Sequence, residues 1–195
     1  MATRFLPLIL SVDEHGIIHW WIDASFAVHD NMKSRTGLCM SLGKGTVYAA
    51  STKQKLNITS STESELFGVS DGMPKMIWSR YFMEAQGYNV EDVYVYQDNQ
   101  SAILLETNGM KSVGKNSRHI RIKYFFVTDR IKDKELNVIY CPTKQMVADF
   151  FTKPLQGVLF VTHRNTVLGI CENDMPVYRA QYDKYIAARN ETNTT

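Results

Sequence analysis

The feature that most constrains the fold is an apolar and aromatic run, IIHWWIDASFAV at 17–28, which contains a single acid, Asp23. Such a run, bounded by polar residues, predicts a largely buried β-strand. A carboxylate inside a buried strand is costly unless it is paired, hydrogen-bonded or bound to a cation. An edge position would make Asp23 harmless; otherwise the rest of the fold must supply a partner for it.

The pattern along the rest of the chain predicts an α/β fold, in which helices pack on a mixed sheet. Strands at 36–43 and 46–51 should form an antiparallel meander with the first strand. Helical periodicity begins at Ser61 and ends at Gly87, with a kink or restart expected at Pro74, which lacks the N–H of a helix hydrogen bond. Alternation follows, with strands at 93–97 and 136–141 and helices at 100–106, 116–134, from 143 into the 150s, and at 157–169.

Composition excludes several classes of protein. The 195 residues are 44% hydrophobic and 11% aromatic, which excludes a disordered, collagen-like or coiled-coil chain. No apolar run is long enough to cross a bilayer, so we expect no membrane partner, and we interpret the short run at 5–10 as a buried strand. The three cysteines, Cys39, Cys141 and Cys171, lack metal-binding or disulfide spacing, which indicates free thiols and an intracellular location.

Several acids stand alone at the ends of predicted elements. Asp98 lies where a strand becomes a helix, and Asp149 lies in the largely apolar segment MVADFFTKPL. Together with Asp23, and with Glu63 or Glu65 in the first turn of the first long helix, they suggest one site for a hard metal ion. Mg²⁺ prefers carboxylate oxygens, and two such ions can hold the attacking and leaving oxygens of a phosphodiester.

Each of these acids also has an ordinary structural explanation. Asp98 could cap the helix that follows it, and Asp149 could be a solvated helix acid. Residues i and i+2 lie about 200° apart on a helix, so only one of Glu63 and Glu65 can face a given site. Both glutamates stand three residues after a Ser or Thr, as in a capping box, so the residues alone do not choose between them.

The clearest basic stretch runs from Thr107 to Thr128 and contains no acid, although the net charge of the whole chain is only +2. Such a run is often a solvated helix face. Its other explanation is contact with the phosphate backbone of a nucleic acid, which positions a substrate without reading its sequence. The candidate nucleic-acid-binding residues are Lys111, Lys115, Arg118, His119, Arg121 and Lys123, with Arg35 from elsewhere in the chain.

A family resemblance rests on segments that occur in one order along residues 16–170. They are WWIDASFAVHDNMKSRTG (20–37), STKQKLNITSSTESEL (51–66), KMIWSRYFMEAQG (75–87), VYQDNQSAILL (95–105), NSRHIRIKYFFVTDRI (116–131) and YCPTKQMVADFFTKPLQG (140–157). Together they resemble the ribonuclease H domain at the C-terminal end of the reverse-transcriptase polyprotein of copia-type LTR retrotransposons.

The resemblance implies a ribonuclease H-like α/β fold. Its five-stranded mixed sheet has three antiparallel strands followed by strand–helix alternation, and helices flank it. The resemblance also implies a domain at 16–170, preceded at 1–15 by the junction with the polymerase part. We assign no role to the tail at 171–195.

In that family, four acids in the order Asp, Glu, Asp, Asp hold two Mg²⁺ ions. Asp23, Asp98 and Asp149 match the first, third and fourth positions. Glu65 matches the second better than Glu63, because a bulky apolar residue follows it, and Glu63 is then the cap. The resemblance implies that these four residues are both catalytic and metal-binding, and that Mn²⁺ is an acceptable substitute for Mg²⁺.

The implied activity is endonucleolytic hydrolysis of the RNA strand of an RNA–DNA hybrid during reverse transcription. One ion would activate the attacking water, the other would stabilise the leaving 3′ oxygen, and the 2′-OH would distinguish RNA from DNA. The expected partners are the hybrid and the reverse-transcriptase polymerase domain in cis. The expected location is the cytoplasm, in a virus-like particle, or the nucleus.

Two alternatives belong to other functional classes. A related nuclease or integrase would carry its last acid, a glutamate, on a late helix, which the early Glu65 argues against. A domesticated or decayed copy would bind nucleic acid or tether a polymerase without catalysis, and the presence of all four acids disfavours it. His119 and His163 match no family position clearly, and we expect His119 to be structural or to contact RNA.

Overall fold

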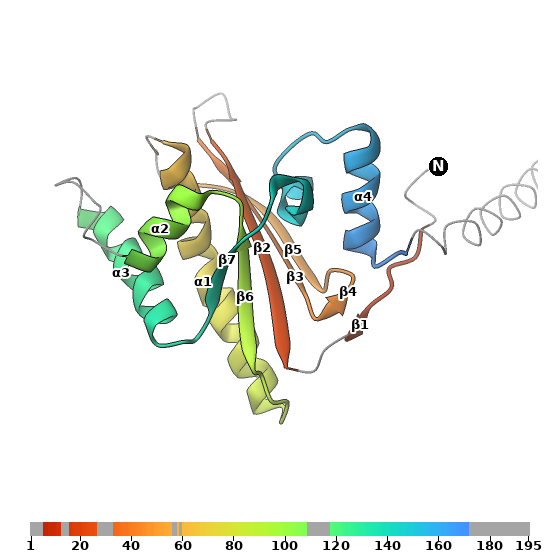
Figure 1. Cartoon of the computed structure of the whole chain (residues 1–195), viewed down its shortest axis with the longest axis horizontal. Coiled ribbons are helices and arrows are strands. Elements are labelled where there is room, and N and C mark those ends of the chain that lie inside the picture. The colour runs from red at the N-terminus through yellow and green to blue at the C-terminus, as the bar shows by residue number, and fades with distance from the viewer. Residues whose placement is uncertain are drawn as a thin grey trace, which may run out of the picture.

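The fold is organised around a five-stranded mixed sheet with the strand order β5-β3-β2-β6-β7 (Figure 1). The computed structural model describes residues 6–12, 16–26, 33–55, 58, 60–108 and 118–171, and within this part only the backbone of 118–124. The strands of the sheet are β2 (Ile17–Ser25), β3 (Arg35–Ser41), β5 (Tyr48–Lys53), β6 (Asp92–Gln97) and β7 (Asn137–Tyr140).

Strand pairing follows the predicted topology. β2 pairs antiparallel with β3, and β3 with β5, whereas β6 lies parallel to β2 and β7 parallel to β6. A separate two-stranded sheet joins β1 (Ser11–Val12) to β4 (Gly43–Lys44). The prediction of an α/β fold with an antiparallel meander followed by alternation is therefore confirmed, and β2 is an inner strand rather than an edge.

Helices cover both faces of this sheet. Figure 1 shows α1, α2 and α3 gathered on one side, and α4 with the neighbouring short helix η4 on the other. None of the helices in the described part of the chain is long and apolar enough to cross a membrane. The helices are α1 (Ser61–Ala85), α2 (Gln100–Asn108), α3 (Arg118–Lys132) and α4 (Gly157–Leu168), with the short 3₁₀ helices η3 (Thr143–Gln145) and η4 (Val147–Phe151).

The main core lies between the sheet and α1. Alternate residues of a strand point to opposite faces of the sheet. On β2, Ile18, Trp20 and Ile22 point to the same face and are buried against α1. Val69 and Met73 of α1 are fully buried in the same cluster. This packing fixes α1 across the central strands.

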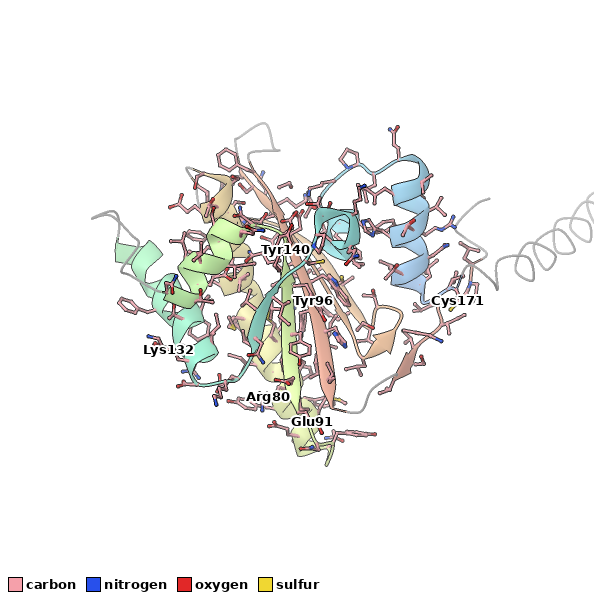
Figure 2. The ribbon with its side chains drawn as sticks, viewed as in Figure 1. Arg80, Glu91, Tyr96, Lys132, Tyr140 and Cys171 are labelled. Carbon is pink, nitrogen blue, oxygen red and sulfur yellow. The ribbon has the colours of Figure 1, made fainter. Side chains whose placement is uncertain are left out.

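A smaller core forms on the opposite face of the sheet. Met146 and Ala148 pack there with Cys141, against Trp21 of β2 and Tyr96 of β6. Figure 2 shows Tyr96 on the central part of the sheet, beside the strand β7. These contacts hold η4 against the strands, so the segment that contains Asp149 lies on the sheet.

The predicted restart at Pro74 is wrong, because α1 is one helix with Pro74 inside it. Proline removes one backbone hydrogen bond from a helix. Val69, Met73 and Met76 are fully buried around the proline, and tertiary packing of this kind supplies most of the stability of helices in proteins. Burial therefore maintains the helix across the missing bond.

Two other segments differ from the prediction. The stretch after Pro142 forms two 3₁₀ helices rather than an α-helix. The apolar run at 5–10 forms no strand in its described part, where Leu6 is buried but Leu8 and Leu10 are exposed.

Gly37 allows η4 to approach the sheet closely. It lies on β3 directly opposite Asp23 in the strand register. A Cβ atom at this position would lie 2.7 Å from Cγ2 of Thr152 and 2.9 Å from the carbonyl oxygen of Ala148. Because a backbone carbonyl cannot rotate away, any side chain here would push η4 off the sheet.

We therefore expect Gly37→Ala to lower the free energy of unfolding by about 1–3 kcal/mol, the usual cost of overpacking. Urea unfolding of the two proteins measures this difference. Gly68→Ala is the matched control, because its Cβ would meet side-chain atoms rather than backbone: methyl groups of Ile22 and Thr36 at 3.3 Å and the hydroxyl oxygen of Thr36 at 3.6 Å. Alanine also favours a helix. Equal losses in the two variants would contradict the proposed close approach.

Candidate metal centre

Three acids meet at one end of the sheet. Asp23 lies near the end of β2, Glu65 in the N-terminal part of α1, just after its first turn, and Asp98 directly after β6. One carboxylate oxygen from each lies within 4.8 Å of the other two. They converge because β2 and β6 are parallel neighbours that end at the same edge, where α1 begins (Figure 1).

Glu65, rather than Glu63, belongs to this group. Glu65 is buried, and the backbone N–H of Ala24 donates a hydrogen bond to its carboxyl group. The α1 cap is Ser60, whose hydroxyl oxygen accepts the backbone N–H of Glu63 at 3.2 Å. Glu65 is therefore the glutamate that lies with Asp23 and Asp98.

Asp98 does not cap α2. The side-chain oxygen of the next residue, Asn99, accepts the backbone N–H of Ala102 at 3.1 Å. The carboxylate of Asp98 instead accepts a hydrogen bond of 3.0 Å from the hydroxyl group of Thr143. This hydrogen bond fixes the carboxylate of the half-buried Asp98 close to Asp23 and Glu65.

Asp149 reaches the acid group through a lysine. Among the described residues it stands outside the set of three converging acids, yet it is buried on η4 rather than solvated. Lys153 Nζ lies 2.7 Å from Oδ1 of Asp149 and 3.2 Å from Oδ1 of Asp23. The hydroxyl group of Thr152 donates to Oδ2 of Asp23. The four predicted acids are therefore neighbours, three directly and the fourth through Lys153.

Burial changes the protonation of two of these acids. Burial raises the pKa of Glu65 to about 9, and the charge of Asp23 adds to the effect. Burial likewise raises the pKa of Asp149 to about 6, although the hydrogen bond from Lys153 opposes the change. Without a bound cation, Glu65 is therefore protonated at neutral pH.

Lys153 stays charged in this environment. Burial alone would lower the pKa of its ammonium group, but the charge of Asp23 and the hydrogen bond with Asp149 raise that pKa above its usual value. Burial, together with the positive charge of Lys153, lowers the pKa of His163 on α4. His163 is thus a buried neutral residue.

Sequence reasoning missed three polar residues that hold the acids: Thr143, Thr152 and Lys153. Lys153 follows Asp149 by four residues, the spacing at which a cation and an acid can meet on one helical turn, and this was the available signal. Nothing in the sequence indicated that the pair would also reach Asp23, because that contact depends on how η4 packs against β2.

For most residues of the predicted basic surface, the structure describes no side chain. Arg35 on β3 is engaged within the sheet, where its guanidinium group donates to the hydroxyl oxygen of Ser51 at 2.9 Å. Lys111 and Lys115 lie outside the described residues, and Arg118, His119, Arg121 and Lys123 belong to the start of α3, where only the backbone is described. A nucleic-acid-binding role for these residues stays a prediction.

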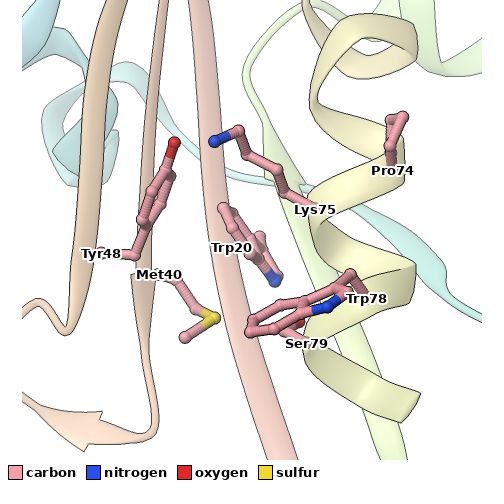
Figure 3. A pocket seen from close by; sticks show the side chains of 7 residues that line it. All are labelled: Trp20, Met40, Tyr48, Pro74, Lys75, Trp78 and Ser79. Atoms are coloured by element: carbon pink, nitrogen blue, oxygen red, sulfur yellow. The ribbon is translucent and has the colours of Figure 1, made fainter. Parts of the chain in front are cut away.

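An apolar cavity of about 360 Å³ lies between α1 and the strands, and Figure 3 shows its walls. Lys75 Nζ lies 4.6 Å from the centre of the Tyr48 ring. Within the described part of the chain, the lining includes none of the four acids, so the cavity is separate from them. The lining residues are Trp20, Met40, Tyr48, Pro74, Lys75, Trp78 and Ser79.

Comparison with known proteins identifies relatives among transposon polyproteins, although no protein-family model matches the chain. It is 32% identical over 138 residues to the retrovirus-related Pol polyprotein from transposon TNT 1-94 of Nicotiana tabacum, covering 70% of this chain and 10% of the polyprotein. The transposon RE2 polyprotein of Arabidopsis thaliana is 28% identical over 168 residues, with coverage of 80% and 11%. The Ty1-JR2 Gag-Pol polyprotein of Saccharomyces cerevisiae is 28% identical over 133 residues, with coverage of 68% and 8%.

The chain thus spans about a tenth of the length of these relatives. Among solved structures, LC11-RNase H1, isolated from compost, superposes with a TM-score of 0.50 at 13% identity, covering 70% of this chain and 92% of that one. At this identity the likeness concerns the fold alone. This chain is therefore homologous to a segment of the retrovirus-related Pol polyproteins of plant and yeast transposons, and it has the ribonuclease H fold.

Proposed function

We propose that this chain is a ribonuclease H that cleaves the RNA strand of RNA–DNA hybrids endonucleolytically during the reverse transcription of a copia-type retrotransposon. One observation carries the proposal: Asp23, Glu65 and Asp98 converge within 4.8 Å at one end of a ribonuclease H fold. The homology to Pol polyproteins supplies the biological setting, and it supports a polymerase domain in cis as partner.

The acids fit divalent metal ions. Mg²⁺ prefers carboxylate oxygens, and three carboxylates this close repel one another unless a proton or a cation neutralises them. Oε2 of Glu65 is buried and has no hydrogen-bond partner among the described residues, as suits a ligand atom. We assign one Mg²⁺ to Asp23, Glu65 and Asp98, and a second to Asp23 and Asp149.

The chain itself contributes the placement of these oxygens. Thr152 fixes the carboxylate of Asp23, Thr143 that of Asp98, and the N–H of Ala24 that of Glu65. When bound, Mg²⁺ would activate a water molecule and stabilise the leaving 3′ oxygen of the phosphodiester. Because the ligands are held before substrate arrives, little reorganisation is needed during the reaction.

Replacement of Asp98 by Asn tests its role as a metal ligand. Asp98→Asn should lower cleavage of a labelled RNA–DNA hybrid in Mg²⁺ by at least about 100-fold, because it removes a ligand charge that the transition state needs. Its circular dichroism spectrum should remain that of the wild type. Asp133→Asn, at an exposed acid directly after α3, is the control and should cleave normally.

Near-normal cleavage by Asp98→Asn would exclude the assigned site. A wild-type protein that binds the hybrid but cleaves it neither in Mg²⁺ nor in Mn²⁺ would instead favour the non-catalytic alternative, a nucleic-acid-binding or polymerase-tethering domain.

The protonation of Glu65 makes the stability of the metal-free protein depend on pH. Its pKa in the folded protein, about 9, lies above the ordinary 4.5, so between these values the native state binds more protons than the unfolded state. The stability of the metal-free protein therefore falls as pH rises through this window. Glu65→Gln has no proton to lose, and it should stabilise the protein in EDTA at pH 8 by at least about 2 kcal/mol, with little effect at pH 4.

Urea unfolding at the two pH values measures this difference. Glu63→Gln, two residues away on the same helix, is the matched control, and it should not stabilise the protein at pH 8, because an acid in the first turn of a helix favours the folded state. Mg²⁺ should stabilise the wild type and Glu63→Gln but not Glu65→Gln. The reverse pattern would assign the ligand role to Glu63.

Charge removal tests the basic stretch at 107–128. Replacing Lys115, Arg118 and Arg121 together by Gln should weaken binding of the hybrid by about tenfold or more at 0.1 M salt, and should lower the slope of log affinity against log salt by about 2 to 3. Fluorescence anisotropy at several salt concentrations measures both. Lys132→Gln, at the other end of α3, should retain the wild-type slope, and an unchanged slope in the triple variant would refute the contact.

A further inference from the structure

Lys153 occupies the space between two of the proposed metal ligands. Its ammonium nitrogen lies 2.7 Å from Oδ1 of Asp149 and 3.2 Å from Oδ1 of Asp23. Both acidic side chains are 2% exposed, whereas the lysine side chain is 36% exposed. A cation supplied by the chain therefore already bridges these carboxylates, and its side chain has a path to solvent.

The local backbone builds this bridge. The N–H groups of Thr152 and Lys153 both donate to the carbonyl oxygen of Asp149, at 3.2 and 2.9 Å. This turn directs the two consecutive side chains at Asp23, whose Oδ2 accepts from Thr152 and whose Oδ1 accepts from Lys153. Both oxygens of Asp23 are thus engaged from the end of η4.

Lys153 neutralises only part of the charge of the two acids. Asp23 and Asp149 carry two negative charges when ionised, and Lys153 carries one positive charge, so the trio keeps one negative charge. A divalent ion between the two acids would balance them in full. It would also bind the same two oxygens and repel the ammonium group at short range in a partly buried site. Lys153 and a divalent ion therefore compete for this position.

We propose that Lys153 is a built-in counter-ion, which holds Asp149 against Asp23 while no metal ion joins them and which a divalent ion displaces from that position. The inference rests on the proposed function, because it takes the acids to be metal ligands. Lys153 is then a positioning residue. It preserves the geometry of the fourth acid in the metal-free protein. It weakens chiefly the second ion, both of whose assigned ligands it contacts, since the competition lowers the apparent affinity of that ion.

Mn²⁺ binding to the full chain tests the proposal, with the free ion followed by its electron paramagnetic resonance signal. The wild type should bind one ion tightly and a second one weakly. Lys153→Met should bind the second ion at least about tenfold more tightly, which corresponds to about 1.4 kcal/mol. Lys153→Arg keeps the charge and should bind it no more tightly than the wild type.

Lys132→Met is the matched control, because it removes the same charge from the end of α3, away from η4 (Figure 2). It should leave both Mn²⁺ affinities at their wild-type values. An unchanged second affinity in Lys153→Met, or a tighter one in Lys153→Arg, overturns the proposal. A wild-type protein that binds no Mn²⁺ would overturn the proposed function as well, so the two failures are distinguishable.

Thermal unfolding supplies a second measurement. In EDTA, Lys153→Met should melt about 4 °C or more below the wild type, because Asp23 and Asp149 lose their counter-ion. Saturating Mn²⁺ should abolish this difference, since the bound metal ion then neutralises Asp23 and Asp149. A difference that persists in saturating Mn²⁺ would show that the lysine is structural and would overturn the proposal.

Discussion

The burial of Asp23 in an inner strand is the constraint on which the rest of the site depends. A buried carboxylate must be satisfied by donors or by a cation, and here Thr152 and Lys153 provide both. The contacts of Thr152 and Lys153 with Asp23 hold η4 against β3. Gly37 makes this possible, because a Cβ atom there would collide with Ala148 and Thr152. One acid in the strand β2 is thus linked to the packing of a segment near the end of the described chain.

Parallel pairing explains why further acids join Asp23. β2 and β6 end at the same edge, which places Asp98 beside Asp23, and α1 begins there with Glu65. The fold therefore concentrates negative charge at a partly buried position. It tolerates this charge in the absence of metal through the proton on Glu65, whose pKa burial raises, and through the ammonium group of Lys153. Both devices are local responses to electrostatic repulsion that a metal ion would also relieve.

Much of this arrangement could be predicted from the sequence, but not its polar supports. Alternation and turn residues gave the order of the elements, and the position of Asp23 in an apolar strand indicated a site. The family resemblance, now confirmed by homology, was needed to prefer Glu65, because capping patterns fitted both glutamates equally. The helix does not restart at Pro74, because tertiary burial outweighs one missing helix hydrogen bond. The contact of Lys153 with Asp23 could not be predicted from the sequence, because the packing of η4 against β2, rather than local spacing, creates it.

The ion pair between Asp23 and Lys153 joins residues 130 positions apart, and this separation has a consequence for biosynthesis. During translation, the first carboxylate leaves the ribosome long before the residues that neutralise it. The central strands and α1 can form earlier, but the acid group cannot gain its last members until η4 has emerged. Closing a contact of such long range is entropically slow, so assembly of this site is a late step in the maturation of a nascent chain.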